Sequence, residues 1–134
     1  MKKFILFLTV FALFAVNTYA EQSYQLSTHI LDITKGLPVP NVEIRLYKLD
    51  KDGVTWKFIS KGVTDKNGRI ANFLPGTKND GTYKLQFFTY KYFESQGLKS
   101  IYPYVDLVFS INGKSHYHIP ITMSANGYAT YKGN

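Results

Sequence analysis

Short segments in which apolar and polar residues alternate, separated by glycine, proline and asparagine, make up the chain after residue 20. In residues 42–47, for example, Val42, Ile44 and Leu46 occupy every second position. A period of two is typical of a β-strand that is buried on one face. The same pattern predicts strands at residues 24–33, 42–47, 54–62, 70–74, 81–89, 103–111, 115–124 and 128–131.

About eight short strands with very little helix predict an all-β sandwich formed by a single domain. We expect Asn67-Gly68 and Asn112-Gly113 to be hairpin turns, because both residue types accept a positive φ. One short helix is expected at residues 91–96, which end at Gly97, a residue that commonly terminates helices.

The N-terminus resembles a secretory signal peptide. Two lysines precede an apolar run over residues 4–16, and the small residue Ala20 comes just before the first acidic residue. A membrane anchor is the alternative, but the apolar run is shorter than the roughly 20 residues that span a bilayer. We therefore expect a signal peptide at residues 1–20 and a mature domain at residues 21–134. The protein would be periplasmic or secreted, without a membrane anchor after cleavage.

Charge and cysteine content exclude some classes of protein. The formal charge is +7, and removal of residues 1–20, which hold two lysines and no acid, lowers it to +5. The remaining lysines form no block of like charge, so nucleic-acid binding is not expected. A mild positive field would favour an anionic small substrate. The chain has no cysteine, so an exported chain of this size depends on packing, and association between subunits is expected.

Three histidines and an arginine are the candidate chemical residues. His116 and His118 are two residues apart and share a face of one predicted strand, while His29 lies on the first strand. Arg69 follows the Asn67-Gly68 turn and offers a planar fork of donors for a carbonyl or an anion. Each also has an ordinary structural explanation, because polar residues are common on one sheet face and arginine is common at surface turns.

Catalysis by a nucleophilic side chain has little support. The chain has no cysteine, and no serine lies in a Gly-x-Ser-x-Gly turn. Water activated by histidine is the remaining simple route, because imidazole titrates near neutral pH. Three histidines could instead bind catalytic zinc, although no cysteine or acidic residue accompanies His116 and His118. A zinc site therefore remains an alternative on ligand count.

Three segments together resemble the 5-hydroxyisourate hydrolases, the enzyme branch of the transthyretin-like family. Residues 27–32 (Ser-Thr-His-Ile-Leu-Asp) match the family's Ser-Thr-His-hydrophobic-Leu-Asp motif, and residues 116–120 match its His-Tyr-His-hydrophobic-Pro motif. The family's Asp-Gly-Arg appears here as Asn67-Gly68-Arg69. Transthyretin, the hormone carrier on the same fold, lacks these histidines. The resemblance extends over residues 24–134 and points to the enzyme branch.

The C-terminal tail departs from the family pattern. Family members end in Tyr-Arg-Gly-Ser, whereas this chain ends in Tyr131-Lys132-Gly133-Asn134. The positive charge is kept at Lys132, but the planar fork of arginine is lost, and this change matters where a ligand is held through two hydrogen bonds.

The resemblance implies a transthyretin-like β-sandwich of two four-stranded sheets with one short helix, assembled as a homotetramer with active sites at the subunit interface. It implies hydrolysis of 5-hydroxyisourate to 2-oxo-4-hydroxy-4-carboxy-5-ureidoimidazoline in urate degradation, with no metal or organic cofactor. His118 and His29 would orient and deprotonate a water, while Arg69 would stabilise charge on the attacked carbonyl. The residues expected to contact the substrate are His29, Arg69, Tyr131 and Lys132.

Two other functions explain parts of the sequence. A non-catalytic exported protein could bind a small ligand in the same interface channel, which the altered tail favours and the retained histidines and Arg69 oppose. An adhesin or another structural sandwich would account for export and fold but not for the histidines.

Overall fold

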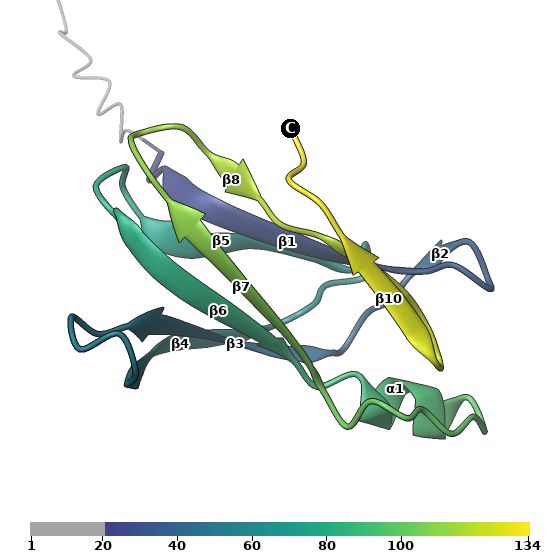
Figure 1. The fold of residues 1–134 in the computed structure, drawn as a ribbon. Helices are drawn as coiled ribbons and strands as arrows, with labels where there is room; N and C mark the ends of the chain where they lie inside the picture. The colour runs from purple at the N-terminus through teal and green to yellow at the C-terminus, as the bar shows by residue number, and fades with distance from the viewer. Residues whose placement is uncertain (1–20) are drawn as a thin grey trace, which may run out of the picture.

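Two β-sheets packed face to face, with one short helix at one end, form the domain (Figure 1). The structure is a computed structural model and describes residues 21–134, so the predicted signal peptide lies outside the described residues. The predicted all-β sandwich with one short helix is confirmed. Within residues 21–134, no helix is long and apolar enough to cross a membrane.

The first sheet is antiparallel and has four strands in the order β4-β3-β6-β7. Leu46, Leu85 and Leu107 lie in register on three adjacent strands and are all buried. Their alternation with exposed or half-buried neighbours is the pattern that predicted these strands from the sequence. The strand bounds are β3 (Glu43–Leu49), β4 (Trp56–Val63), β6 (Gly81–Phe87) and β7 (Val105–Ile111).

The second sheet is built around β1 (Tyr24–Asp32). Along one side of β1 run two antiparallel segments, and along the other side run two parallel segments, the second of which pairs with one further antiparallel segment. The sheet is thus four strands wide but divided into six segments. The other five are β2 (Leu37–Pro38), β5 (Arg69–Pro75), β8 (Tyr117–His118), β9 (Ile121–Ser124) and β10 (Gly127–Thr130).

The strand expected at residues 115–124 is divided at Ile119 and Pro120. Proline has no N–H to donate to a neighbouring strand, so the ladder is interrupted there. The connection is nevertheless anchored to β1. The backbone N–H of Ile119 donates to the Ser27 carbonyl (3.0 Å), and the Thr28 hydroxyl donates to the Ile119 carbonyl (2.7 Å). Both bonds fix the register of β8 relative to β1.

The predicted hairpins at Asn67-Gly68 and Asn112-Gly113 are wrong. Each dipeptide connects strands of different sheets, β4 to β5 and β7 to β8. Both glycines have a positive φ, 72° and 83°, but neither asparagine does. A Cβ on Gly68 would lie 2.7 Å from the Ile30 carbonyl oxygen, so this turn needs glycine to pack against β1. The dipeptide signals a local reversal of the chain, but the pairing partner depends on distant residues.

Helix α1 (Tyr90–Ser95) closes one end of the sandwich and buries Phe93. The hydroxyl of Tyr92 donates to a carboxylate oxygen of Asp32 at 2.6 Å. Burial and this bond raise the pKa of Tyr92 to about 12. Asp32, the last residue of the first family-like motif, therefore ties β1 to the helix.

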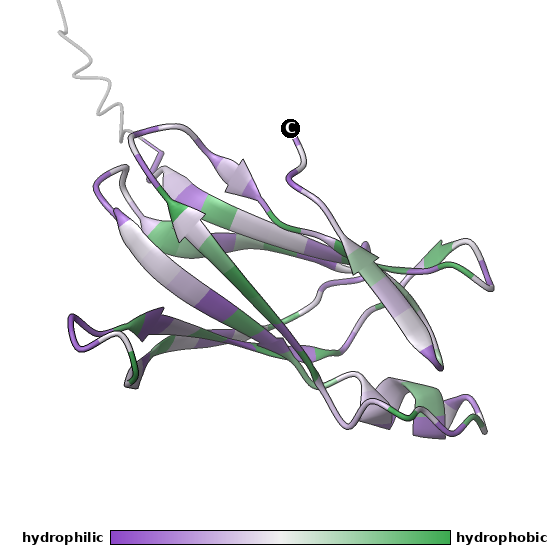
Figure 2. Ribbon diagram, viewed as in Figure 1, coloured by the Kyte–Doolittle hydropathy of each residue, from purple (hydrophilic) through white to green (hydrophobic). Residues whose placement is uncertain are grey.

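The hydrophobic core lies between the two sheets, and apolar residues alternate with polar ones along the strands (Figure 2). On β1 the buried side chains of Leu26, Thr28 and Ile30 face this core. Burying one large aliphatic side chain contributes about 1.5–3 kcal/mol. The alternate residues Ser27 and His29 therefore lie on the outer face of the sheet, where they are half-buried.

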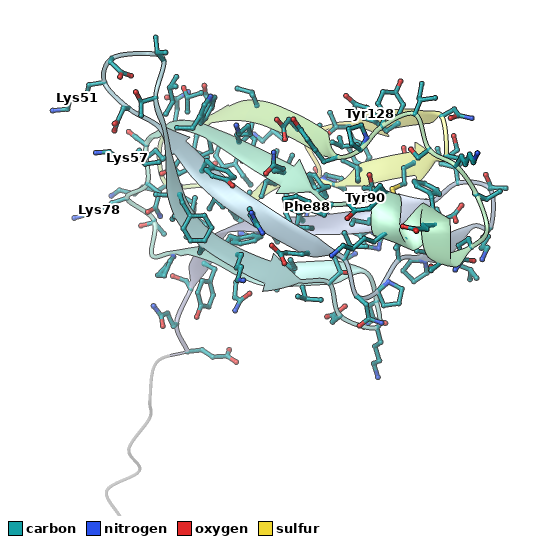
Figure 3. All side chains as sticks on the ribbon, turned by 90° about the horizontal axis from the view of Figure 1, so that it is seen from below. Lys51, Lys57, Lys78, Phe88, Tyr90 and Tyr128 are labelled. Atoms are coloured by element: carbon teal, nitrogen blue, oxygen red, sulfur yellow. The ribbon has the colours of Figure 1, made fainter. Side chains whose placement is uncertain are left out.

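Most lysine side chains within residues 21–134 are directed to solvent. Lys51, Lys57 and Lys78 project outward from the end of the sandwich that is far from α1 (Figure 3). Such exposed ammonium groups keep the basic surface solvated, as the sequence predicts.

Candidate active site

Three neighbouring strands bring His29, Arg69 and His118 to one patch on the outer face of the second sheet. Arg69 lies directly opposite His29 in the antiparallel pairing of β1 with β5. His118 lies opposite Ser27 in the parallel pairing of β1 with β8. Residues that are directly opposite point to the same face of a sheet. The predicted catalytic trio is thus assembled by backbone pairing, although the role of each residue stays a prediction.

Ser27 connects the two histidines of the second family-like motif. Its hydroxyl oxygen lies 2.8 Å from Nε2 of His116 and 2.7 Å from Nδ1 of His118. Nδ1 of His116 lies 2.9 Å from the carbonyl oxygen of Tyr24. This bridging role of Ser27 does not follow from the sequence alone. The feature of the sequence that could have indicated a role at the site is its position two residues before His29, on the same face of the strand.

A tight turn presents Arg69 to this patch. A carboxylate oxygen of Asp65 accepts hydrogen bonds from the backbone N–H groups of Asn67 (2.8 Å) and Arg69 (3.0 Å). The bond from the Arg69 N–H is the main cause that lowers the pKa of Asp65. Within residues 21–134, the exposed guanidinium of Arg69 forms no salt bridge. It is therefore available for an anion or for a polarised carbonyl.

The C-terminal tail packs against His118. The N–H of Gly133 donates to the carbonyl of His118 at 2.8 Å, and these residues form an isolated antiparallel bridge. A Cβ on Gly133 would lie 2.7 Å from Cδ2 of the imidazole. Glycine at this position therefore leaves room for the ring of His118, a packing role that the sequence alone does not indicate.

The same bridge directs Lys132 away from the histidines. Side chains alternate along an extended chain, so the residue next to Gly133 lies on the opposite side of the tail from His118. Nζ of Lys132 lies 4.7 Å from the centroid of the Tyr117 ring. Tyr131 is 58% exposed, and both tail residues line a cavity of about 220 Å³ beside β7. Their predicted contact with substrate thus rests on the family resemblance rather than on the geometry of one chain.

The environment of the patch keeps its histidines neutral. Burial lowers the pKa of His118, and the charges of Arg69, His29 and His116 lower it further. Burial also lowers the pKa of His29, with Arg69 as the second cause, while the Asn67 backbone and Asp65 act in the opposite direction. Both imidazoles therefore keep an unprotonated nitrogen at neutral pH, as a general base requires.

These shifts predict the pH dependence of any reaction that uses His118 as a base. A lowered pKa means that the neutral ring persists below the ordinary value of 6.5. Activity should be full at neutral pH and should fall as the pH drops through that lowered pKa. Measuring kcat/KM from about pH 5 to about pH 8 tests this expectation. An acid limb centred above 6.5 would contradict it.

Metal ligation was the alternative use of these histidines. Within residues 21–134, the structure contains no cluster of three or more His, Cys, Asp or Glu side chains arranged to hold a metal ion.

A transthyretin-like sandwich with two histidines and an arginine on the outer face of one sheet defines a candidate hydrolytic protein. The description of the family whose model matches residues 26–133 is "HIUase/Transthyretin family". The chain belongs to this family.

Relatives and solved structures agree with that assignment. A probable 5-hydroxyisourate hydrolase of Caenorhabditis elegans is 38% identical over the whole length of both chains. The 5-hydroxyisourate hydrolase structure of Klebsiella pneumoniae is 32% identical, with a TM-score of 0.71 over 81% of this chain and 98% of its own. Transthyretin of Sparus aurata is 31% identical, with a TM-score of 0.74 over 81% of this chain and 96% of its own. The fold is thus shared by proteins of both names, so the side chains on the outer face are needed to separate them.

Proposed function

We propose that this chain is a 5-hydroxyisourate hydrolase that produces 2-oxo-4-hydroxy-4-carboxy-5-ureidoimidazoline. The observation that carries the proposal is the convergence of His29, Arg69 and His118 on one sheet face. Full-length relatives named 5-hydroxyisourate hydrolase support the same reaction. Product identity is the direct test. Carbon-13 spectra of the reaction mixture should contain the ring-opened product soon after mixing, and accumulation of a different product would contradict the assignment.

In the proposed reaction, His118 and His29 orient a water molecule and His118 accepts its proton. The water oxygen bonds to the ring carbonyl carbon, and Arg69 stabilises the negative charge that develops on the carbonyl oxygen. The ring C–N bond then breaks, and the imidazolium returns the proton to the leaving nitrogen. Tyr131 and Lys132 hold the substrate from the tail. No step requires a metal or an organic cofactor.

The proposed active site lies between subunits of a homotetramer. In one chain the histidine patch is an open sheet face, whereas a cavity of about 510 Å³ lies elsewhere, between β2 and α1. Binding sites for small molecules usually bury most of the ligand surface, so a second copy is needed to cover this face. A subunit contact would also bring the tail of one chain towards the patch of another.

Light scattering should therefore report about four chains per particle for the purified domain at micromolar concentration. Dilution until the particles dissociate should remove the activity, because each site would lose its cover. A stable and fully active monomer would contradict an interface site.

The proposed location is the periplasm or the exterior of the cell, after removal of residues 1–20. The basic start, the apolar run and Ala20 support this proposal. Mass spectrometry of the exported protein should find a chain that begins at or near Glu21. Retention of the first 20 residues in a membrane fraction would indicate an anchor instead.

A further inference from the structure

A chain of three hydrogen bonds runs behind the proposed catalytic base. It begins at the backbone carbonyl of Tyr24, passes through both nitrogens of His116 and the hydroxyl of Ser27, and ends at Nδ1 of His118. The lengths are 2.9, 2.8 and 2.7 Å in that order. The Nε2 atom of His118 takes no part in this chain, so it is the nitrogen left for water or substrate.

The direction of these bonds follows from the group at their start. A carbonyl can only accept, so Nδ1 of His116 must carry a proton. With His116 in its neutral form, Nε2 is then an acceptor, so the Ser27 hydroxyl donates to it. Since the hydroxyl has one proton, its remaining bond must be accepted from Nδ1 of His118. If the Ser27 hydroxyl instead donated to Nδ1 of His118, lone pairs on the Ser27 oxygen and on Nε2 of His116 would face each other.

We propose that Ser27 and His116 are positioning residues that select the tautomer of His118 in which Nδ1 is protonated and Nε2 is free to act as the base. This inference deepens the proposed hydrolysis and rests on it for its catalytic meaning. The assigned tautomer itself is a property of the free protein. Neither Ser27 nor His116 needs to touch the substrate.

The loop that carries His116 is anchored well enough to maintain this order. The amide nitrogen of Gln25 donates to the carbonyls of Gly113 (2.8 Å) and Ser115 (3.2 Å), just before His116. Gln25 is 1% exposed, and its amide oxygen accepts from the backbone N–H and the side chain of Asn79. The Gln25 amide is buried, and both its nitrogen and its oxygen are hydrogen-bonded, so it fixes the loop against β1.

The charges around His118 act in the same direction. Arg69 from β5, His29 from β1 and His116 from the preceding loop all disfavour a second proton on its ring. Asp65 opposes this only through His29. The ring of His118 thus stays neutral near pH 7, the state in which the choice of tautomer decides whether Nε2 is a base.

Nitrogen-15 spectra of histidine-labelled protein, recorded without substrate, test the proposal directly. The chain has three histidines, so each signal can be assigned from a variant in which one histidine is replaced. In the unaltered protein, His118 should carry its proton on Nδ1. In Ser27→Ala this preference should be lost, and kcat should fall about tenfold with little change in KM, as expected when the correctly protonated fraction shrinks.

Two comparisons separate positioning from a general disturbance. His116→Gln keeps an acceptor near the place of Nε2 and should retain the tautomer, whereas His116→Phe should lose it. Ser115→Ala removes an exposed hydroxyl from the same loop and should change neither spectrum nor rate. A His118 that carries its proton on Nε2 in the unaltered protein, or a tautomer unchanged in Ser27→Ala, would overturn the proposal. These spectra do not depend on turnover, so an inactive protein would refute the proposed function without deciding the tautomer.

Discussion

Replacing His118 with alanine is expected to abolish hydrolysis of 5-hydroxyisourate while the protein stays folded. The half-buried side chain lies on the outer face of the sheet and fills no part of the core, and its backbone bond to Gly133 does not depend on the imidazole. Loss of a general base typically costs about 100-fold to 10,000-fold in rate. Steady-state kinetics measures the loss, and thermal unfolding of the same sample reports the fold.

His116→Ala is the matched comparison, because this ring bonds to the same Ser27 hydroxyl as His118 but does not act on water in the proposed reaction. Its effect should be clearly smaller than that of His118→Ala. Near-normal turnover in His118→Ala would remove His118 from the chemistry.

Replacing Arg69 with alanine is the second change from which a large effect is expected. Removal of one donor to a developing oxyanion typically costs on the order of 100-fold or more in rate. The same change removes a positive charge that lowers the pKa of His29 and His118, so both values should rise towards the ordinary 6.5. Kinetics measures the first effect, and proton titration of the histidines measures the second.

Arg45→Ala is the control for Arg69→Ala. Arg45 pairs with Glu43 and lies over the Phe88 ring, on the other sheet. It should change neither the rate nor the histidine pKa values. Equal losses in both variants would indicate a general effect of surface charge instead of a role for Arg69 at the site.

Much of the fold could be predicted from the sequence because strand residues alternate in the chain itself. The buried positions of β3 and β6 and the short helix before Gly97 follow from local patterns. The parallel pairing of β1 with β8 could not be predicted this way, because it joins residues about 90 positions apart. For the same reason, local sequence predicts that the turns at Asn67 and Asn112 join strands that pair with each other. In the structure, each of these turns instead connects one sheet to the other.

The same difference between local patterns and long-range pairing applies to the candidate site. His29, Arg69 and His118 were recognisable from the motifs that contain them. The bridging role of Ser27 depends on the register of β1 with β8, and the need for glycine at position 133 depends on the ring that packs against it. For the tail, the motif and the structure differ. The motif predicts that Lys132 contacts the substrate, whereas in the single chain its ammonium group lies over the Tyr117 ring.

The decisive measurement of the hydrolase function mixes the purified domain, residues 21–134, with freshly generated 5-hydroxyisourate and follows the loss of its ultraviolet absorbance. Substrate should disappear much faster than in buffer alone, in proportion to protein concentration, and His118→Ala should lower the protein-dependent rate by about 100-fold or more. A rate equal to that of buffer alone for the unaltered protein, together with saturable binding of the same compound, would instead identify a non-catalytic ligand-binding protein.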